Sequence, residues 1–337
     1  MEQMPTPAKL FPYPSSWYVI ENSENLKPLQ LINKKIAGKE FVLFRTEKGE
    51  VCLADAYCPH LGGHFAHGGH IEGETIVCPF HYFCFDTKGS CTKTGYGTKP
   101  PPKAVLKTYP IREKNGFIIY WHDENELQPS WEVPVTNDDD WTEIRTADFL
   151  LNSHPQETTE NSVDVGHFSV VHKYSNITTI KELNAEGAYL NASYGFNRAP
   201  EGFIGKGTKG IKAEINIHVH GLGYSFVEVD LPEMQLKTRQ YVFPTPVGDN
   251  KINLKIGMSV NKNYKASKIH PALSVLPKKM LTKILLNKAF AGYVNDVSQD
   301  FKIWENKVYM DYPALAKGDG PIGKYRQWAK QFYQGNP

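Results

Sequence analysis

The alternation of apolar and polar residues divides the chain into a first part made of short strands and a second part that mixes strands with helices. Through the first 122 residues, short apolar segments bounded by turn residues recur, a pattern typical of β-strands. The segments with this pattern are 17–20, 40–45, 51–54, 71–77 (a hairpin), 107–113 and 116–121. They predict a small all-β domain over residues 17–122, preceded by an N-terminal lead of residues 1–16.

A polar and acidic segment, residues 123–140, follows this domain and is the predicted linker. In residues 141–337 the pattern changes: residues 155–174 have helical spacing, and residues 277–309 predict one or two further helices. Between them, the segments 212–220, 225–230 and 251–256 alternate with a period of two. Antiparallel strands with helices gathered on one face make an α+β fold, which we predict for this second domain.

Composition changes this picture little. The chain has 337 residues, enough for two domains, and its net charge of +2 is too small to indicate nucleic-acid binding. Five cysteines, an odd number, argue against a disulfide framework and indicate a reducing compartment. The N-terminus is polar and no apolar run is long enough for a transmembrane helix, so we expect a cytoplasmic protein.

Residues 268–290 alternate lysines with leucine, isoleucine and methionine. We expect a helix that packs on its own domain and presents a solvated lysine face. Contact between an apolar cap and an anionic membrane surface is the less favoured alternative.

The first candidate for chemistry is a pair of half-motifs, Cys58-Pro59-His60 and Cys78-Pro79-Phe80-His81. Two thiolates and two imidazoles suit a tetrahedral zinc ion, and they also suit a Rieske [2Fe–2S] cluster, in which two Cys hold one iron and two His the other. Zinc sites usually pair Cys with Cys and His with His at short spacing. Interleaved Cys–His halves in Gly/Pro loops, separated by a small hairpin, favour the cluster.

From about Trp17 to Trp121 the sequence resembles Rieske domains. Mitochondrial-type Rieske proteins carry an extra Cys in each loop, and those positions here are Gly63 and Phe80. The sequence therefore resembles the oxygenase branch of the family. The cluster ligands that this resemblance implies are Cys58, His60, Cys78 and His81.

A second motif lies in residues 160–172, where His167 and His172 are five residues apart. Two His and a carboxylate can form a facial triad that leaves coordination positions on Fe(II) open for O₂. The segment resembles, in order and spacing, the Asn/Glu-x-x-Asp-x-x-His-x4-His signature of Rieske non-haem iron oxygenases. On a regular helix, five residues turn about 500°, so the helix must break, bulge or end near His172 for both rings to reach one metal.

The resemblance also implies a third ligand in a late helix, in a Gln-Asp-x-x-Ile-Trp context. Asp300 has this context, and Asp296 is the reserve candidate. In the resembling enzymes, the residue that matches Asp164 hydrogen-bonds an iron-ligand His and meets a cluster-ligand His, here His81, of a neighbouring subunit. This role implies a head-to-tail ring, which we expect to be a homotrimer.

The context around Cys58 and the late Ile303-Trp304-Glu305 resemble the ketosteroid 9α-hydroxylase and sterol 7-desaturase branch. The resemblance implies a terminal oxygenase with a Rieske cluster and a mononuclear Fe(II), which uses O₂ to hydroxylate, desaturate or demethylate a bulky apolar, sterol-like substrate. No dinucleotide-binding fingerprint occurs, so electrons must come from a separate NAD(P)H-dependent reductase or ferredoxin. The alternatives are an oxygenase acting on an aromatic or other small substrate, and a non-catalytic Rieske electron carrier.

Overall fold

The computed structural model describes residues 12–198 and 210–333. Contacts divide the chain into two compact units. The N-terminal unit holds Trp17–Val135 together with the short segment Thr245–Asp249, and the C-terminal unit holds Thr136–Pro244, Asn250–Pro337 and the residues up to Ser16. The domain boundaries drawn from the sequence stay predictions.

The N-terminal unit is built of short antiparallel strands. Within the described residues they form the sheets β1-β11-β10, β2-β3-β4-β9 and β5-β6-β7-β8. Their bounds are β1 Ser16–Asn22, β2 Leu31–Ile36, β3 Lys39–Arg45, β4 Val51–Asp55, β5 His70–Glu72, β6 Thr75–Val77, β7 Cys84–Phe85, β8 Cys91–Lys93, β9 Thr108–Tyr109, β10 Ile111–Lys114 and β11 Phe117–His122. The predicted all-β character is confirmed.

Strand β3 shows why the strands of this unit appear in the sequence as continuous apolar segments. Phe41 and Leu43 belong to one buried cluster, whereas Val42 and Phe44 belong to another, so both faces of the strand are covered. The second of these clusters also contains Cys58 and Cys78, which ties the two motif loops to the core of the unit.

The C-terminal unit is organised on one large sheet. Its strand order in the described residues is β12-β18-β17-β16-β15-β14-β13. The bounds are β12 Arg145–Asn152, β13 Ser175–Glu186, β14 Tyr189–Arg198, β15 Ile211–His220, β16 Tyr224–Leu231, β17 Leu236–Gly248 and β18 Lys251–Val260. On β15, Ala213, Ile215, Ile217 and Val219 are buried and alternate with partly exposed polar residues. The predicted α+β fold is confirmed.

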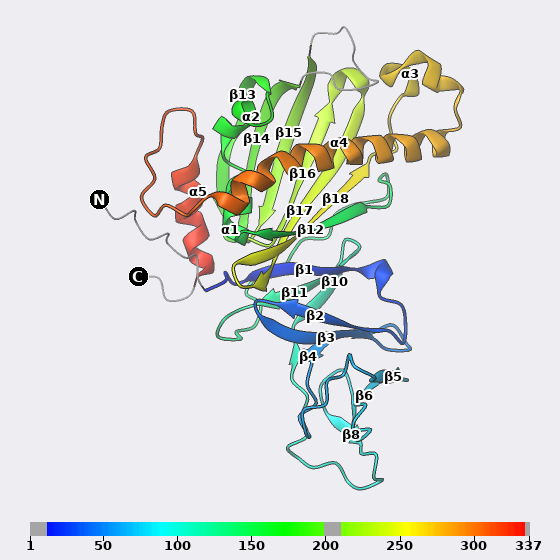
Figure 1. Ribbon diagram of the computed structural model, residues 1–337. Helices are drawn as coiled ribbons and strands as arrows, with labels where there is room; N and C mark the ends of the chain where they lie inside the picture. The colour runs from blue at the N-terminus through cyan, green and yellow to red at the C-terminus, as the bar shows by residue number, and fades with distance from the viewer. Residues whose placement is uncertain (1–11, 199–209, 334–337) are drawn as a thin grey trace. The chain divides into compact units, whose positions relative to one another are not determined.

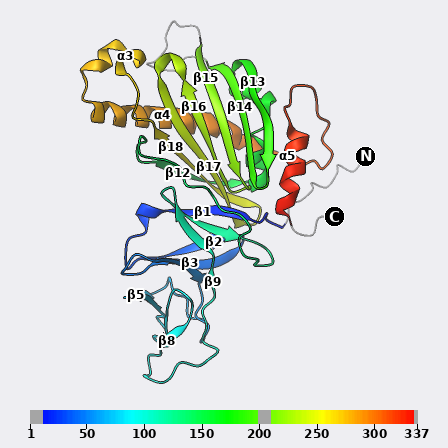
Figure 2. The same ribbon diagram turned by 180° about the vertical axis from the view of Figure 1, so that it is seen from behind.

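One long helix, α4 (Lys278–Asn306), lies across one face of this sheet, as the two opposite views show (Figures 1 and 2). Phe290, Tyr293 and Trp304 of α4 pack against Leu254 and Ile256 of β18. The predicted helical stretch 277–309 is therefore a single helix. The remaining helices are α1 Pro155–Glu160, α2 Val165–Val170, α3 Ala266–Ile269 and α5 Ile322–Ala329, with 3₁₀ turns at Ser23–Asn25, Pro232–Met234, Pro271–Val275 and Lys330–Phe332.

The stretch with helical spacing, residues 155–174, contains two short helices rather than one. Helix α1 ends at Glu160 and α2 begins at Val165, because the Asp164 side chain accepts a hydrogen bond from the His167 N–H and caps the new helix. No helix in the part of the chain that the structure describes is long and apolar enough to cross a lipid bilayer.

Candidate metal centres

The two Cys–His loops of the N-terminal unit have the same backbone hydrogen bonds. The Cys58 N–H donates to Gly63 O and the Cys78 N–H donates to Phe83 O, each at 2.9 Å. The carbonyl oxygens of the same two cysteines accept from the residue four positions later, which in each loop has a positive φ. The two loops thus form equivalent turns, and each turn carries one Cys and one His of the candidate site.

The loops bring all four predicted cluster ligands together. Cys58 and Cys78 are buried, and the rings of His60 and His81 lie 4.8 Å apart. A hydrogen bond between the two sulfur atoms, together with the Phe80 and His81 N–H groups, lowers the pKa of Cys78. The Nδ1 atom of His81 is buried without a hydrogen-bond partner within the described residues. An unsatisfied imidazole nitrogen beside two sulfur atoms fits a bound metal cluster.

The backbone of Gly63 lies close to the side chains of Cys78 and Phe80 in this site. A Cβ added there would lie 3.0 Å from both Cys78 Sγ and Phe80 Cβ. The two positions at which mitochondrial-type proteins carry a cysteine pair are therefore adjacent in space here, but neither holds a sulfur atom.

The second candidate centre lies in the C-terminal unit. His167, His172 and Asp300 each offer a ligand atom, and these atoms all lie within 4.8 Å of one another. His172 Nε2 is 3.5 Å from Asp300 Oδ2, and the two imidazole rings are 5.0 Å apart. Residues that are 128 positions apart in the sequence thus form the donor set that a facial triad requires.

Helix α2 meets the geometric condition derived from the sequence, because it ends at Val170 and His172 lies beyond its end. Lys173 then has a φ of 60°, a left-handed conformation that turns the chain into β13. The ring of His167 is oriented through Nδ1, which contacts the backbone carbonyl oxygen of Asp164. Its Nε2 is thereby left for the metal.

Asp300 and Asp296 have different surroundings on α4. Asp296 forms an ion pair with Arg198, with 2.8 Å between Oδ2 and Nη1. Asp300 is only 5% exposed, and its carboxylate accepts a hydrogen bond from Asn161. Asn161 is itself held by Trp304, whose Nε1 lies 3.3 Å from its Oδ1.

The electrostatics of this centre suit a cation. Burial lowers the pKa of His167 to about 4 and also lowers the pKa of His172, so both rings are neutral near neutral pH. Burial, and secondly the charge of Asp164, raises the pKa of Asp300 to about 7. A divalent cation would offset the cost of the buried carboxylate charge, so the residues fit a mononuclear Fe(II).

Sequence reasoning missed three features of this centre. Asn161 contacts Asp300, and Gln299 Oε1 lies 3.4 Å from His172 Nδ1; both lie inside motifs that the resemblance drew on. An aromatic pair also lies on one side of His172: Tyr174 is 5.3 Å from it and stacks on Phe196 at 4.2 Å. The Asp164 carbonyl oxygen contacts the His167 ring, and the Asp164 carboxylate lies 3.9 Å from His167 Nδ1; the expected role of Asp164 stays a prediction.

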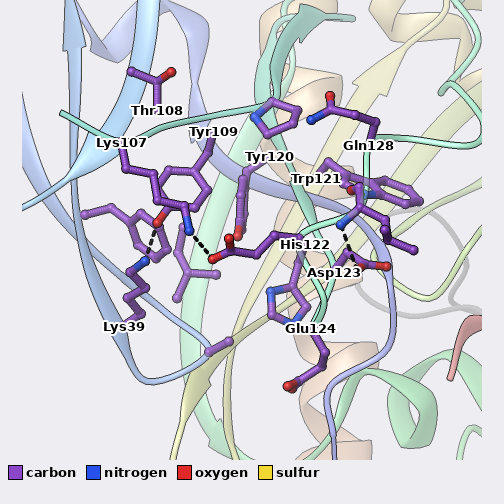
Figure 3. A pocket seen from close by; sticks show the side chains of 16 residues that line it. Lys39, Lys107, Thr108, Tyr109, Tyr120, Trp121, His122, Asp123, Glu124 and Gln128 are labelled. Atoms are coloured by element: carbon purple, nitrogen blue, oxygen red, sulfur yellow. Dashed lines mark hydrogen bonds and ion pairs between the residues drawn. The ribbon is translucent and has the colours of Figure 1, made fainter. Parts of the chain in front are cut away.

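A pocket in the N-terminal unit is unrelated to either centre, since none of the candidate ligands lines it. Figure 3 shows Lys39 and Lys107 beside Tyr109 at this pocket. Lys39 is paired with Asp55 at 2.9 Å and Lys107 with Glu126, so the charges of the two lysines are already balanced. We assign no ligand to it.

The fold and the two donor sets define a Rieske non-haem iron oxygenase, an oxidoreductase with a [2Fe–2S] cluster and a mononuclear iron. Residues 16–110 match the Rieske [2Fe–2S] domain, and residues 120–333 match the family described as the 3-ketosteroid 9α-hydroxylase C-terminal domain. The chain belongs to this family of Rieske oxygenases.

Individual relatives agree with this assignment. A cholesterol 7-desaturase of Drosophila melanogaster is 31% identical over 96% of this chain and 76% of its own length. The oxygenase component of a Rhodococcus rhodochrous 3-ketosteroid-9-alpha-monooxygenase is 29% identical over 88% of this chain and 75% of its own. Caffeine-bound NdmA of Pseudomonas putida CBB5 has a similar fold, with a TM-score of 0.70 at 16% identity over 93% of this chain and 89% of that chain. Dicamba monooxygenase gives 0.64 at 16% identity, over 94% and 96%.

Proposed function

We propose that the protein is the terminal oxygenase of a multicomponent monooxygenase that uses O₂ to hydroxylate, desaturate or demethylate a sterol- or steroid-like substrate. Electrons come from a separate reductase or ferredoxin. The observation that carries the proposal is the grouping of His167, His172 and Asp300 within 4.8 Å in a chain that also folds a Rieske domain. The residues assigned to the [2Fe–2S] cluster are Cys58, His60, Cys78 and His81.

When bound, the cluster supplies single electrons and the mononuclear iron supplies open coordination positions for O₂. The chain's own residues do the positioning. The Asp164 carbonyl oxygen orients the His167 ring, Gln299 faces Nδ1 of His172, and Asn161 holds the Asp300 carboxylate. Each ligand thus has a polar neighbour that fixes its direction.

The aromatic residues near His172 support an apolar substrate. Tyr174 and Phe196 stack, and Phe168 lies 6.3 Å from Tyr174 and 5.8 Å from Tyr194. Such rings offer a large apolar contact area to a fused-ring molecule and little to a small cation. The named activities of the matched relatives, on cholesterol and on 3-ketosteroids, point in the same direction.

The proposal includes a head-to-tail homotrimer in which Asp164 of one subunit meets His81 of the next. The Asp164 side chain is 35% exposed, and the His81 ring is half-buried, so both are accessible to a neighbour. A carboxylate between two metal-bound imidazoles would orient both rings.

Iron content and turnover test the proposal. We expect about three irons per chain in the wild type and about two in Asp300→Asn, with the cluster absorption unchanged. Asp296→Asn, four residues earlier on α4, is the matched control and keeps all three. Two irons in the wild-type protein, all in the cluster, would leave the electron-carrier alternative standing.

The substrate class is tested by turnover of a panel of sterols, aromatic acids and quaternary amines, with a reductase and O₂ supplied. Oxidation of sterols is the expected result. Activity confined to small polar amines or aromatic acids would contradict the sterol assignment while leaving the oxygenase assignment intact.

A further inference from the structure

The C-terminal unit carries a strongly basic segment. Between residues 261 and 295 the chain has seven lysines and neither aspartate nor glutamate, although the whole protein has a net charge of only +2. Without these lysines the chain would be net negative. The segment forms α3, the turn Pro271–Val275 and the first half of α4.

Six of the lysines are exposed, and across the described residues none of the six forms an ion pair. The seventh, Lys262, donates to the backbone carbonyl of Asp139. Three large apolar side chains are exposed among them: Val275 at 85%, Met280 at 45% and Ile284 at 41%. We call this set the lysine-rich surface; it consists of Lys265, Lys268, Lys278, Lys279, Lys283, Lys288, Val275, Met280 and Ile284.

Helical geometry places the apolar and basic groups of α4 side by side. Residues four apart lie about 40° from one another around a helix, so Met280, Ile284 and Lys288 form one row. Lys279 and Lys283 form the adjacent row on the exposed side. Leu281 and Leu285, in the row on the other side, are buried, which turns the two exposed rows away from the domain.

The elements that carry the lysine-rich surface pack against a buried apolar cluster. Ile269, Leu273 and Leu276, from α3 and the turn after it, pack on the cluster that contains Leu281 and Leu285. In Figures 1 and 2, α3 lies beside the N-terminal end of α4. The lysines and the exposed apolar residues therefore belong to one packed assembly.

We propose that the lysine-rich surface docks this protein onto the surface of an anionic lipid bilayer. Unpaired lysines attract acidic headgroups, while side chains such as Met280 and Ile284 enter the boundary with the acyl chains. A basic face that only contacts water would not need exposed apolar groups within it. The alternative to a lipid surface is an acidic protein that binds the same lysines. The biological reason, uptake of an apolar substrate from the bilayer, rests on the proposed function, but the docking itself does not.

Sedimentation with lipid vesicles tests the proposal. We expect the wild-type protein to sediment with vesicles of phosphatidylcholine and phosphatidylglycerol and to stay in solution with phosphatidylcholine alone. Added salt weakens the binding, because it screens the headgroup charge. Replacing Lys279, Lys283 and Lys288 together by Gln lowers the partition coefficient more than about tenfold.

The matched control replaces Lys181, Lys324 and Lys330 by Gln, which removes the same charge from exposed positions elsewhere in the unit. It retains binding. A second variant, Val275→Ser with Met280→Ser and Ile284→Ser, keeps every lysine and still binds more weakly. Equal thermal midpoints show that each variant is folded.

Three outcomes overturn the proposal: no sedimentation of the wild type with anionic vesicles, equal binding by the two lysine variants, or unchanged binding of the serine variant. If the wild type ignores vesicles but the Lys279, Lys283 and Lys288 variant raises the KM for the reductase, the surface docks a protein instead. Because vesicle binding needs neither iron nor substrate, its failure is distinguishable from failure of the proposed function.

Discussion

Gln299 determines how the imidazole of His172 is presented. Its Oε1 faces His172 Nδ1 at 3.4 Å, from the residue next to Asp300 on α4. An acceptor on Nδ1 selects the tautomer whose Nε2 lone pair can bind a metal. We therefore expect Gln299→Leu to weaken mononuclear iron binding by about 10- to 100-fold, measured by titrating iron into metal-depleted protein.

Two variants make that measurement specific. Gln299→Glu keeps an oxygen acceptor and should restore most of the affinity. Ser298→Ala alters the preceding residue, whose hydroxyl donates to the Asn295 carbonyl, and should bind iron like the wild type. Equal affinity for Gln299→Leu and the wild type would show that the contact does not orient His172.

His154 gives the C-terminal unit a pH-dependent stability. Burial lowers its pKa to about 3, and the ring is stacked with Tyr13, with centroids 5.6 Å apart. The folded state therefore excludes a proton that the unfolded chain binds below about pH 6.5, so the free energy of unfolding falls as the pH drops through that value. The loss from this residue is about 1.4 kcal/mol at about pH 5.5.

His154→Asn tests this dependence. His154 Nδ1 accepts from the Gln156 N–H and caps α1, and an asparagine oxygen can take over this bond without titrating. Denaturant unfolding near pH 7.5 and near pH 5.5 should show a smaller drop for the variant than for the wild type. Identical drops would assign the acid sensitivity to other residues.

At the level of elements, the end of α2 decides whether His172 reaches the metal. Lys173 follows with a φ of 60°, a conformation that glycine adopts freely and that costs a β-branched residue about 1–2 kcal/mol. Lys173→Val should move the end of the helix and lower iron occupancy. Lys173→Gly removes the same charge but keeps the turn, so iron analysis should find wild-type occupancy.

Some of this arrangement was readable from the sequence, because the ligands lie in short motifs. The half-motifs at Cys58 and Cys78 indicated a cluster, and the five-residue spacing from His167 to His172 already required an interrupted helix. The contacts of Asn161 and Gln299 were not readable, since they depend on α4 returning to α2 after more than a hundred residues.

The same physical limit applies to the fold. Periodicity predicted strands and the α4 helix because burial of one face is a local pattern. It could not show that the segment Thr245–Asp249, which is the end of β17 and the first residue of the turn after it, belongs to the N-terminal unit, where Ala37 N–H donates to Pro246 O at 2.9 Å. Nor could it separate α1 from α2, because a single cap at Asp164 made the break.

At the scale of the whole molecule, the proposed trimer leads to a prediction about mixed subunits. Cys58→Ser should lose the cluster but keep the mononuclear iron, and Asp300→Asn should do the reverse. Neither variant alone should be active. If electrons pass from the cluster of one subunit to the iron of its neighbour, a mixed trimer contains pairs in which both partners are intact.

Co-expression of the two variants at equal levels tests this transfer. With random assembly, half of the mononuclear sites are intact and half of their neighbouring clusters are intact, so about a quarter of the wild-type turnover should return. Transfer confined within a chain predicts none, because no chain carries both centres. In the mixed trimer the mononuclear iron of the Cys58→Ser chain performs the reaction, so adding Asp164→Asn to that chain should abolish the recovered activity. The Asp300→Asn chain contributes only its cluster, so adding Asp164→Asn to it should leave the recovered activity intact.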